Sequence, residues 1–98
     1  MRRFLYLYIG GHGPDTDSAA LLHRGAWLAY CRRLGPAILD PGGRLDTASD
    51  AGAPACEPSP RGFMLVQARD VAEAHALAEL HPHRATGGDV VVLEVVRT

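Results

Sequence analysis

The stretch Phe4-Leu5-Tyr6-Leu7-Tyr8-Ile9 decides the fold of this chain. All of its positions are apolar or aromatic, and Gly10 and Gly11 follow it, which indicates a β-strand. Successive side chains of a strand point to opposite faces of a sheet, so this strand is apolar on both faces. A strand of this kind is buried on both sides, and the rest of the molecule must supply two covers for it.

The segments that follow alternate between helix and strand patterns. Asp17 or Ser18 caps a helix that stops at Gly35-Pro36, and the Asp70-x-x-Glu73 spacing of a capping box opens a second helix that ends before Pro82. The remaining predicted strands cover residues 37–40, 62–68 and 89–96. The order β-α-β-β-α-β is that of a ferredoxin-like split sandwich, an α+β fold with one four-stranded antiparallel sheet and both helices on one face.

Length, charge and cysteine content restrict the class of protein. The 98 residues form one domain, 1–98, in which residues 44–60 are expected to be a long, mobile or functional loop. A net charge of −1 gives no electrostatic footprint for nucleic acid, and the apolar runs are too short to cross a bilayer, so we expect neither partner. Cys31 and Cys56 are too few for a disulfide framework, which favours a cytoplasmic location.

The other predicted strands are also apolar on both faces. Residues 90–96 are valines and one leucine, with Glu94 as the one interruption, and residues 63–66 are apolar throughout. Two helices cover only one face of a sheet, and the other face would then expose an apolar patch on the order of several hundred Å². We therefore expect a homodimer whose two sheets pack face to face about a two-fold axis. The alternative is that the long loop or a chain end covers this face.

Polar residues with acid–base chemistry gather at one end of the predicted sandwich. They are His12, His23, Asp40, His81 and His83. An imidazole beside a carboxylate transfers protons near physiological pH. We expect His23 or His81 to act as general base and Asp40 to orient an imidazole. For His23, the alternative is a packed, hydrogen-bonded histidine of the helix.

Other side chains at the same end are expected to contact a small-molecule substrate. They are His12, Trp27, Tyr30 and His83, with Tyr30 as a hydroxyl donor. For His12, an ordinary surface position is the alternative. His81-Pro82-His83 with His12 or His23 would also supply imidazoles to a zinc ion, but it lacks the helical i, i+4 spacing of a metal site. No metal or other cofactor is therefore expected.

Several segments carry a resemblance to a known family. They are the strand 4–8, Trp27-Leu28-Ala29-Tyr30, Ala37-Ile38-Leu39-Asp40-Pro41-Gly42, Gly62-Phe63-Met64-Leu65-Val66, Asp70-Val71-Ala72-Glu73-Ala74 and His81-Pro82-His83. In this order and spacing the chain resembles the YCII-related family and its DGPF-type relatives. The resemblance implies a dimeric α+β barrel. It also implies a small-molecule enzyme, with a His–Asp pair suggested as catalytic in some members and elimination of chloride from a chlorinated ring in one branch.

The chain departs from the family pattern at its candidate catalytic positions. Typical members carry an Asp before the proline that ends the second helix, where this chain has His81, and the first-helix His matches only approximately, at His23 or Arg24. Asp40 is the nearest replacement carboxylate. We expect a lyase- or isomerase-type enzyme that performs elimination or proton transfer. The alternative is a non-catalytic small-molecule-binding or accessory module that dimerises through its sheet.

Overall fold

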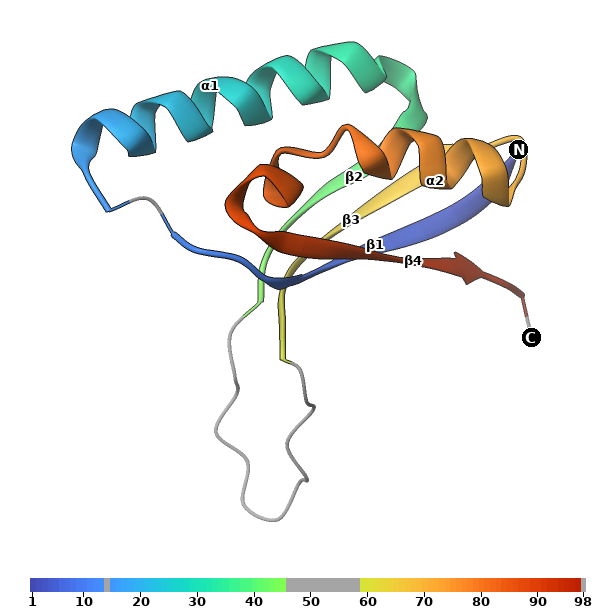
Figure 1. The fold of residues 1–98 in the computed structure, drawn as a ribbon. Coiled ribbons are helices and arrows are strands. Elements are labelled where there is room, and N and C mark those ends of the chain that lie inside the picture. Colours follow the sequence, from blue (N-terminus) through green and yellow to red (C-terminus); the bar gives the residue numbers. More distant parts are fainter. Residues whose placement is uncertain (14, 46–58, 98) are drawn as a thin grey trace.

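The computed structural model describes residues 1–13, 15–45 and 59–97 as a sheet with helices on one side (Figure 1). Its elements are β1 (Arg2–Gly10), α1 (Asp17–Leu34), the 3₁₀-helix η1 (Gly35–Ala37), β2 (Ile38–Arg44), β3 (Pro60–Ala68), α2 (Val71–Glu79), the 3₁₀-helix η2 (Pro82–Thr86) and β4 (Gly88–Val95). The strand order is β2-β3-β1-β4, and all neighbouring strands are antiparallel. The α+β class and the ferredoxin-like order of elements are confirmed.

The helix ends follow local capping chemistry. Asp70 caps α2 as predicted, because its Oδ1 accepts a hydrogen bond from the backbone N–H of Glu73 at 2.8 Å. The prediction for α1 was wrong by one position: the capping residue is Thr16, whose Oγ1 accepts from the N–H of Ala19 at 3.0 Å. Asp17 instead occupies the first turn, where its negative charge interacts favourably with the positive end of the helix dipole.

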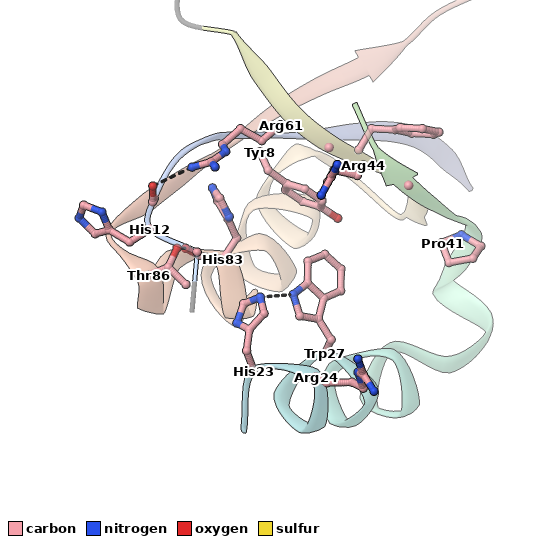
Figure 2. Close-up of a pocket in the computed structure, with 15 residues that line it drawn as sticks. Tyr8, His12, His23, Arg24, Trp27, Pro41, Arg44, Arg61, His83 and Thr86 are labelled. Atoms are coloured by element: carbon pink, nitrogen blue, oxygen red, sulfur yellow. Dashed lines mark hydrogen bonds between the residues drawn. The ribbon is translucent and has the colours of Figure 1, made fainter. Parts of the chain in front are cut away.

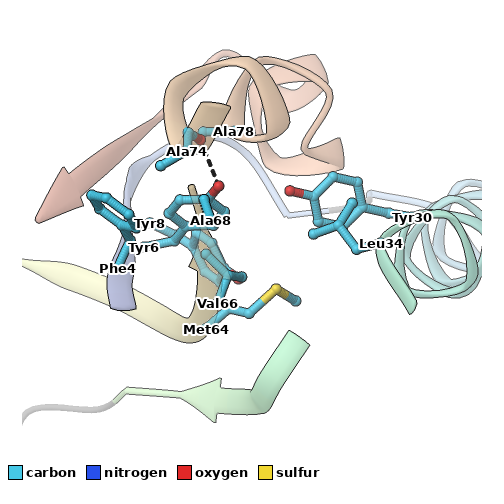
Figure 3. Packing of buried hydrophobic residues seen from close by; sticks show 10 residues of the cluster. All are labelled: Phe4, Tyr6, Tyr8, Tyr30, Leu34, Met64, Val66, Ala68, Ala74 and Ala78. Atoms are coloured by element: carbon cyan, nitrogen blue, oxygen red, sulfur yellow. Dashed lines mark hydrogen bonds between the residues drawn. The ribbon is translucent and has the colours of Figure 1, made fainter. Parts of the chain in front are cut away.

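The core lies between the two helices and the face of the sheet that they cover (Figure 3). It consists of Phe4, Tyr6, Tyr8, Tyr30, Leu34, Met64, Val66, Ala68, Ala74 and Ala78. Tyr6 donates its hydroxyl hydrogen to the carbonyl of Ala74 at 2.6 Å, which ties β1 to α2. Burial, with a smaller contribution from Glu73, raises the pKa of Tyr6 to about 12, so this hydroxyl stays a donor.

The opposite face of the sheet is apolar and open in the single chain. Leu5, Leu7 and Leu65 on its central strands are half-buried, while Val91 and Leu93 on β4 are 39% and 44% exposed. The alternation predicted from the sequence, with apolar residues on both faces, is therefore confirmed. None of the helices in the described part of the chain is long and apolar enough to span a membrane.

The β2 strand differs most from the prediction. It does not end at Asp40 but runs from Ile38 to Arg44, through Pro41 and the glycines that were expected to close it. An edge strand tolerates proline, and Gly42 adopts a φ of 74°, in the left-handed region that glycine enters readily. Its register shifts between Ile38 and Asp40 and again before Gly43.

Smaller differences affect the other strands and the long loop. β3 begins at Pro60 instead of Gly62, and β4 spans Gly88–Val95 instead of 89–96. Of the loop predicted over 44–60, residues 46–58 lie outside the described residues, and Cys56 lies outside them as well.

Candidate functional site

A cavity of about 420 Å³ opens on the helix-covered side of the sheet, at the end where β1 leads into α1 (Figure 2). The side chains around it come from α1, β1, β2, β3, η2 and the loop after β1. Its polar and aromatic lining residues are Tyr8, His12, His23, Arg24, Trp27, Arg44, Arg61, Phe63, His83 and Thr86. The described lining residues include no aspartate or glutamate.

Tyr8 and Trp27 form an aromatic corner of the cavity. Their ring centroids lie 5.4 Å apart and the ring planes meet at 77°. The Tyr8 ring lies against Gly62 of the paired strand, where a Cβ atom would come within 2.9 Å of the ring. The Tyr8 hydroxyl is buried and has no hydrogen-bond partner among the described residues. Burial raises the pKa of Tyr8, so the hydroxyl stays protonated and is a donor without an acceptor.

His23 presents a hydrogen-bond donor at the cavity. Its Nε2 accepts a hydrogen bond from Nε1 of Trp27 at 2.8 Å, one helical turn away on α1. An indole nitrogen only donates, so Nε2 carries no proton and the neutral imidazole carries its proton on Nδ1. No partner for Nδ1 exists among the described residues. The two residues are four positions apart on α1, which places their side chains on one face of the helix, and their contact fixes the tautomer.

His83 presents a hydrogen-bond acceptor, the opposite of His23. Its Nε2 lies 3.0 Å from the carbonyl oxygen of Ile9, which only accepts, so Nε2 carries the proton. The lone pair of Nδ1 has no partner among the described residues and is available as a base. The imidazole packs directly against Gly88, where a Cβ atom would lie 2.2 Å from Nε2. The absence of a side chain at Gly88 therefore makes room for the His83 ring, which is held by the backbone carbonyl of Ile9 on β1.

His81 occupies the core instead of the cavity. Its side chain is 2% exposed, and its ring centroid lies 4.4 Å from that of Tyr8 and 4.6 Å from those of Trp27 and Tyr30. Its Nδ1 accepts from the backbone N–H of His83 at 3.1 Å and caps η2. Burial first, then the nearby His83 and His23, lower the pKa of His81 to about 3. Because its lone pair is already used, His81 is not placed to act as the expected base.

Asp40 and Tyr30 also lie outside the cavity lining. The register shift in β2 pairs Asp40 with Leu65, a residue of the open face, and paired residues share a face. The Asp40 carboxylate accepts from the N–H of Gly42 at 2.8 Å. Tyr30 is buried and donates its hydroxyl hydrogen to the carbonyl of Leu77 at 2.8 Å. The expected roles of Asp40 as orienter and Tyr30 as substrate donor therefore do not fit this arrangement.

The remaining predicted site residues meet at the cavity. His12, His23, Trp27 and His83 line it together, and the loop carrying His12 is held by a hydrogen bond from the His12 N–H to the carbonyl of Thr86 at 3.1 Å. Arg24, Arg44, Arg61 and Tyr8 also line the cavity but were not among the predicted site residues. The signal that was available is the inward alternation of β1, which places Tyr8 on the same face as the core.

The structure gives no support to a metal site at these histidines. Among residues 1–13, 15–45 and 59–97, no group of three or more His, Cys, Asp or Glu side chains is arranged to hold a metal ion. Nδ1 of His81 accepts a hydrogen bond from the backbone N–H of His83, so this nitrogen is not free to ligate a metal ion together with the His83 ring.

The burial of His81 predicts a dependence of stability on pH. In the unfolded chain its pKa is near 6.5, whereas in the folded chain it is about 3. The stabilisation is therefore complete above about pH 6.5 and is lost progressively as the pH falls toward 3, because only the unfolded chain binds the proton. Between pH 7 and pH 5 the free energy of unfolding is expected to fall by at most about 2 kcal/mol from this group.

The measurement is urea unfolding at both pH values for the wild type and a His81→Asn variant. Asparagine retains an oxygen that caps η2 but does not titrate, so the variant is expected to lack this part of the pH dependence. The ion-paired carboxyls of Glu73 and Glu94 have lowered pKa values and stay ionised over this range. Equal pH dependence in the two proteins would show that His81 titrates normally in the folded state.

Comparison with known proteins identifies a structural relative. The 5-chloro-2-hydroxyhydroquinone dehydrochlorinase of Burkholderia phenoliruptrix, solved in complex with 2,5-dihydroxybenzoquinone, superposes with a TM-score of 0.61 at 23% sequence identity. The match covers 98% of this chain and 95% of that chain. No protein-family model matches the chain, and no curated protein matches it in sequence. The likeness shows that the two proteins share a fold.

Proposed function

We propose that this chain is a small-molecule enzyme of the lyase or isomerase type, which catalyses elimination or proton transfer by acid–base chemistry. The observation that carries the proposal is the pair of opposite imidazole tautomers at one cavity. His83 offers an unprotonated Nδ1, and His23 offers a protonated one. With both imidazoles neutral, a ligand that reaches both Nδ1 atoms would lose a proton to His83 and receive a hydrogen bond from His23 without rearrangement of either ring.

The elimination of a hydrogen halide is one reaction that this pair would support. Nδ1 of His83 would take a proton from the substrate, the electrons of the broken bond would form a new double bond, and the halide would leave with the electron pair of its bond to carbon. His23 Nδ1–H would stabilise negative charge on a substrate oxygen as it develops. The activity named for the structural relative, a dehydrochlorinase, supports this choice.

One observation favours the alternative of a non-catalytic binding or accessory module. The described lining residues contain no carboxylate, so neither imidazole has the acidic partner that commonly orients a catalytic histidine. In this chain the carbonyl of Ile9 and the indole of Trp27 perform the orienting. Turnover decides between the two functions, because a binding module takes up ligand without converting it.

We also propose a homodimer, membership of the YCII-related family and a cytoplasmic location. The open apolar face of β1, β3 and β4 supports the dimer, because two copies related by a two-fold axis would bury it. The shared fold of the relative supports the family. The free thiol of Cys31 fits a reducing compartment.

The test of the enzymatic proposal is halide release from a panel of chlorinated hydroquinones and hydroxyquinones, followed with a chloride electrode and by the absorbance of the quinone product. We expect one equivalent of chloride per molecule of at least one compound, above the rate in buffer alone. A His75→Gln variant, changed at an exposed histidine of α2 outside the cavity, should keep the wild-type rate. Binding without turnover across the panel would favour the binding module.

A further inference from the structure

We propose that Arg24, Arg44 and Arg61 form a clamp for a planar organic anion, a single ring that carries ionised oxygen substituents. This inference rests on the proposed function, because it assigns a substrate class to the same cavity. The cavity wall is positively charged. Three guanidinium groups line it, and no described lining residue is acidic, although the chain as a whole has a net charge of −1.

The three arginines are not neutralised by the rest of the described protein. The ion pairs among the described residues are Arg2–Glu94, Arg69–Glu73 and Arg84–Glu79, and all of them lie outside the cavity lining. Guanidinium groups keep their charge at any physiological pH. Positive charges without an ion-pair partner among the described residues, placed around one cavity, favour an anionic ligand.

The fold directs these side chains from two opposite walls (Figure 2). Arg44 of β2 pairs with Gly62, a position on the helix-covered face, so its side chain is on the cavity side of the sheet. Arg61 of β3 donates from Nη1 to the carbonyls of Gly11 at 2.8 Å and Gly10 at 3.3 Å. Arg24 comes from α1, on the other side of the cavity.

The anchoring of Arg61 leaves part of its guanidinium group unused. A guanidinium group has five N–H donors, and among the described residues only Nη1 of Arg61 has acceptors. The Nε and Nη2 donors of Arg61 therefore have no protein partner there. An arginine fixed at one nitrogen and open at the others is suited to bind the oxygen atoms of an anion.

The aromatic corner indicates a flat ligand. Tyr8 and Trp27 meet at 77°, so a ring that stacks on one of them meets the edge of the other. The Tyr8 hydroxyl is buried beside this corner, has no partner among the described residues and stays protonated, so it adds an unsatisfied donor next to the ring site. A compact anion such as phosphate would use the charges but not the rings.

The experiment measures binding of two quinones with the same ring and different charge. 2,5-Dihydroxybenzoquinone has acidic hydroxyls, and 2,5-dimethoxybenzoquinone has none. Isothermal titration calorimetry gives the dissociation constants, and quenching of Trp27, the one tryptophan of the chain, locates binding at the cavity. We expect the dihydroxy compound to bind at least about tenfold more tightly, less so at high salt, and inorganic phosphate to bind at least about tenfold more weakly than it does.

Arginine variants test the clamp directly. Arg44→Gln and Arg61→Gln are each expected to weaken binding of the dihydroxy compound by about tenfold and to leave binding of the dimethoxy compound unchanged. Arg32→Gln is the matched control, since it removes the same charge from an exposed position of α1 that lies outside the cavity, and it should bind as the wild type does. Circular dichroism of each variant checks that it is folded.

The outcomes separate this inference from the proposed function. Equal affinity for the two quinones, no binding of either, or unchanged affinity in the Arg44 and Arg61 variants would overturn the clamp, even if turnover were found with another substrate. If phosphate bound as tightly as the dihydroxy compound, the claim that the clamp selects a planar ring would be overturned. Arginine-dependent binding without turnover would support the clamp and count against the enzyme.

Discussion

A His83→Gln variant is expected to turn over substrate about 10²- to 10⁴-fold more slowly than the wild type, because a positioned general base contributes a factor of that size. Glutamine keeps an N–H that can reach the carbonyl of Ile9, so the loop and η2 should hold their positions. It lacks a lone pair of sufficient basicity to take a proton. The measurement is kcat for chloride release, with the melting temperature recorded to show that the fold is intact.

Two further variants show which histidine is the base. His75→Gln should keep the wild-type kcat, because its side chain is exposed on α2 and outside the cavity. His81→Asn should be less stable but should retain turnover within about tenfold, because His81 is buried and its lone pair caps η2. A loss in His81→Asn as large as that in His83→Gln would contradict our assignment and make His81 the base.

The second large effect is expected at the open face of the sheet. A Leu93→Glu substitution should weaken the proposed dimer by more than about 10³-fold, because the two-fold axis places the new charge in the interface twice. Leu93 is 44% exposed in the single chain and lies at the centre of β4. Sedimentation equilibrium at micromolar concentration is expected to give a dimer for the wild type and a monomer for the variant.

The control for this substitution is Leu21→Glu on α1. Leu21 is 67% exposed and lies on the helix side, so it should leave the dimer intact. A wild-type chain that sediments as a monomer at these concentrations would contradict the dimer. The apolar face would then need a cover from within the chain, such as the long loop.

The order of elements could be predicted because it depends on local patterns. Alternation in β1 and β3 needs only the residues of each strand, and the capping of α2 depends on Asp70 and on the backbone N–H of Glu73 three residues later. The same alternation predicted that both faces of the sheet are apolar, and the exposed Val91 and Leu93 agree with it. These features do not depend on how the elements pack.

The site could be predicted only in part because it depends on register and packing. Asp40 changes face through a register shift in β2, which a pattern with a period of two does not reveal. His81 follows the end of a helix, a position that is often exposed, and its burial among Tyr8, Trp27 and Tyr30 depends on how two other elements, β1 and α1, pack around it. Arg44 and Arg61 border the long loop, and only the strand pairing brings them to the cavity wall.

The backbone of η2 links the hydrophobic core of the molecule to His83, the proposed base. The N–H of His83 is held by a core side chain, and its ring is held by a carbonyl of the first strand. Changes to the aromatic residues around His81 would therefore displace the proposed base as well as weaken core packing, so we expect this part of the sequence to tolerate few substitutions. Arg24 stands on α1, apart from that linkage. Relatives that act on different compounds should differ first at Arg24 on α1 and only rarely in η2, which carries the proposed base.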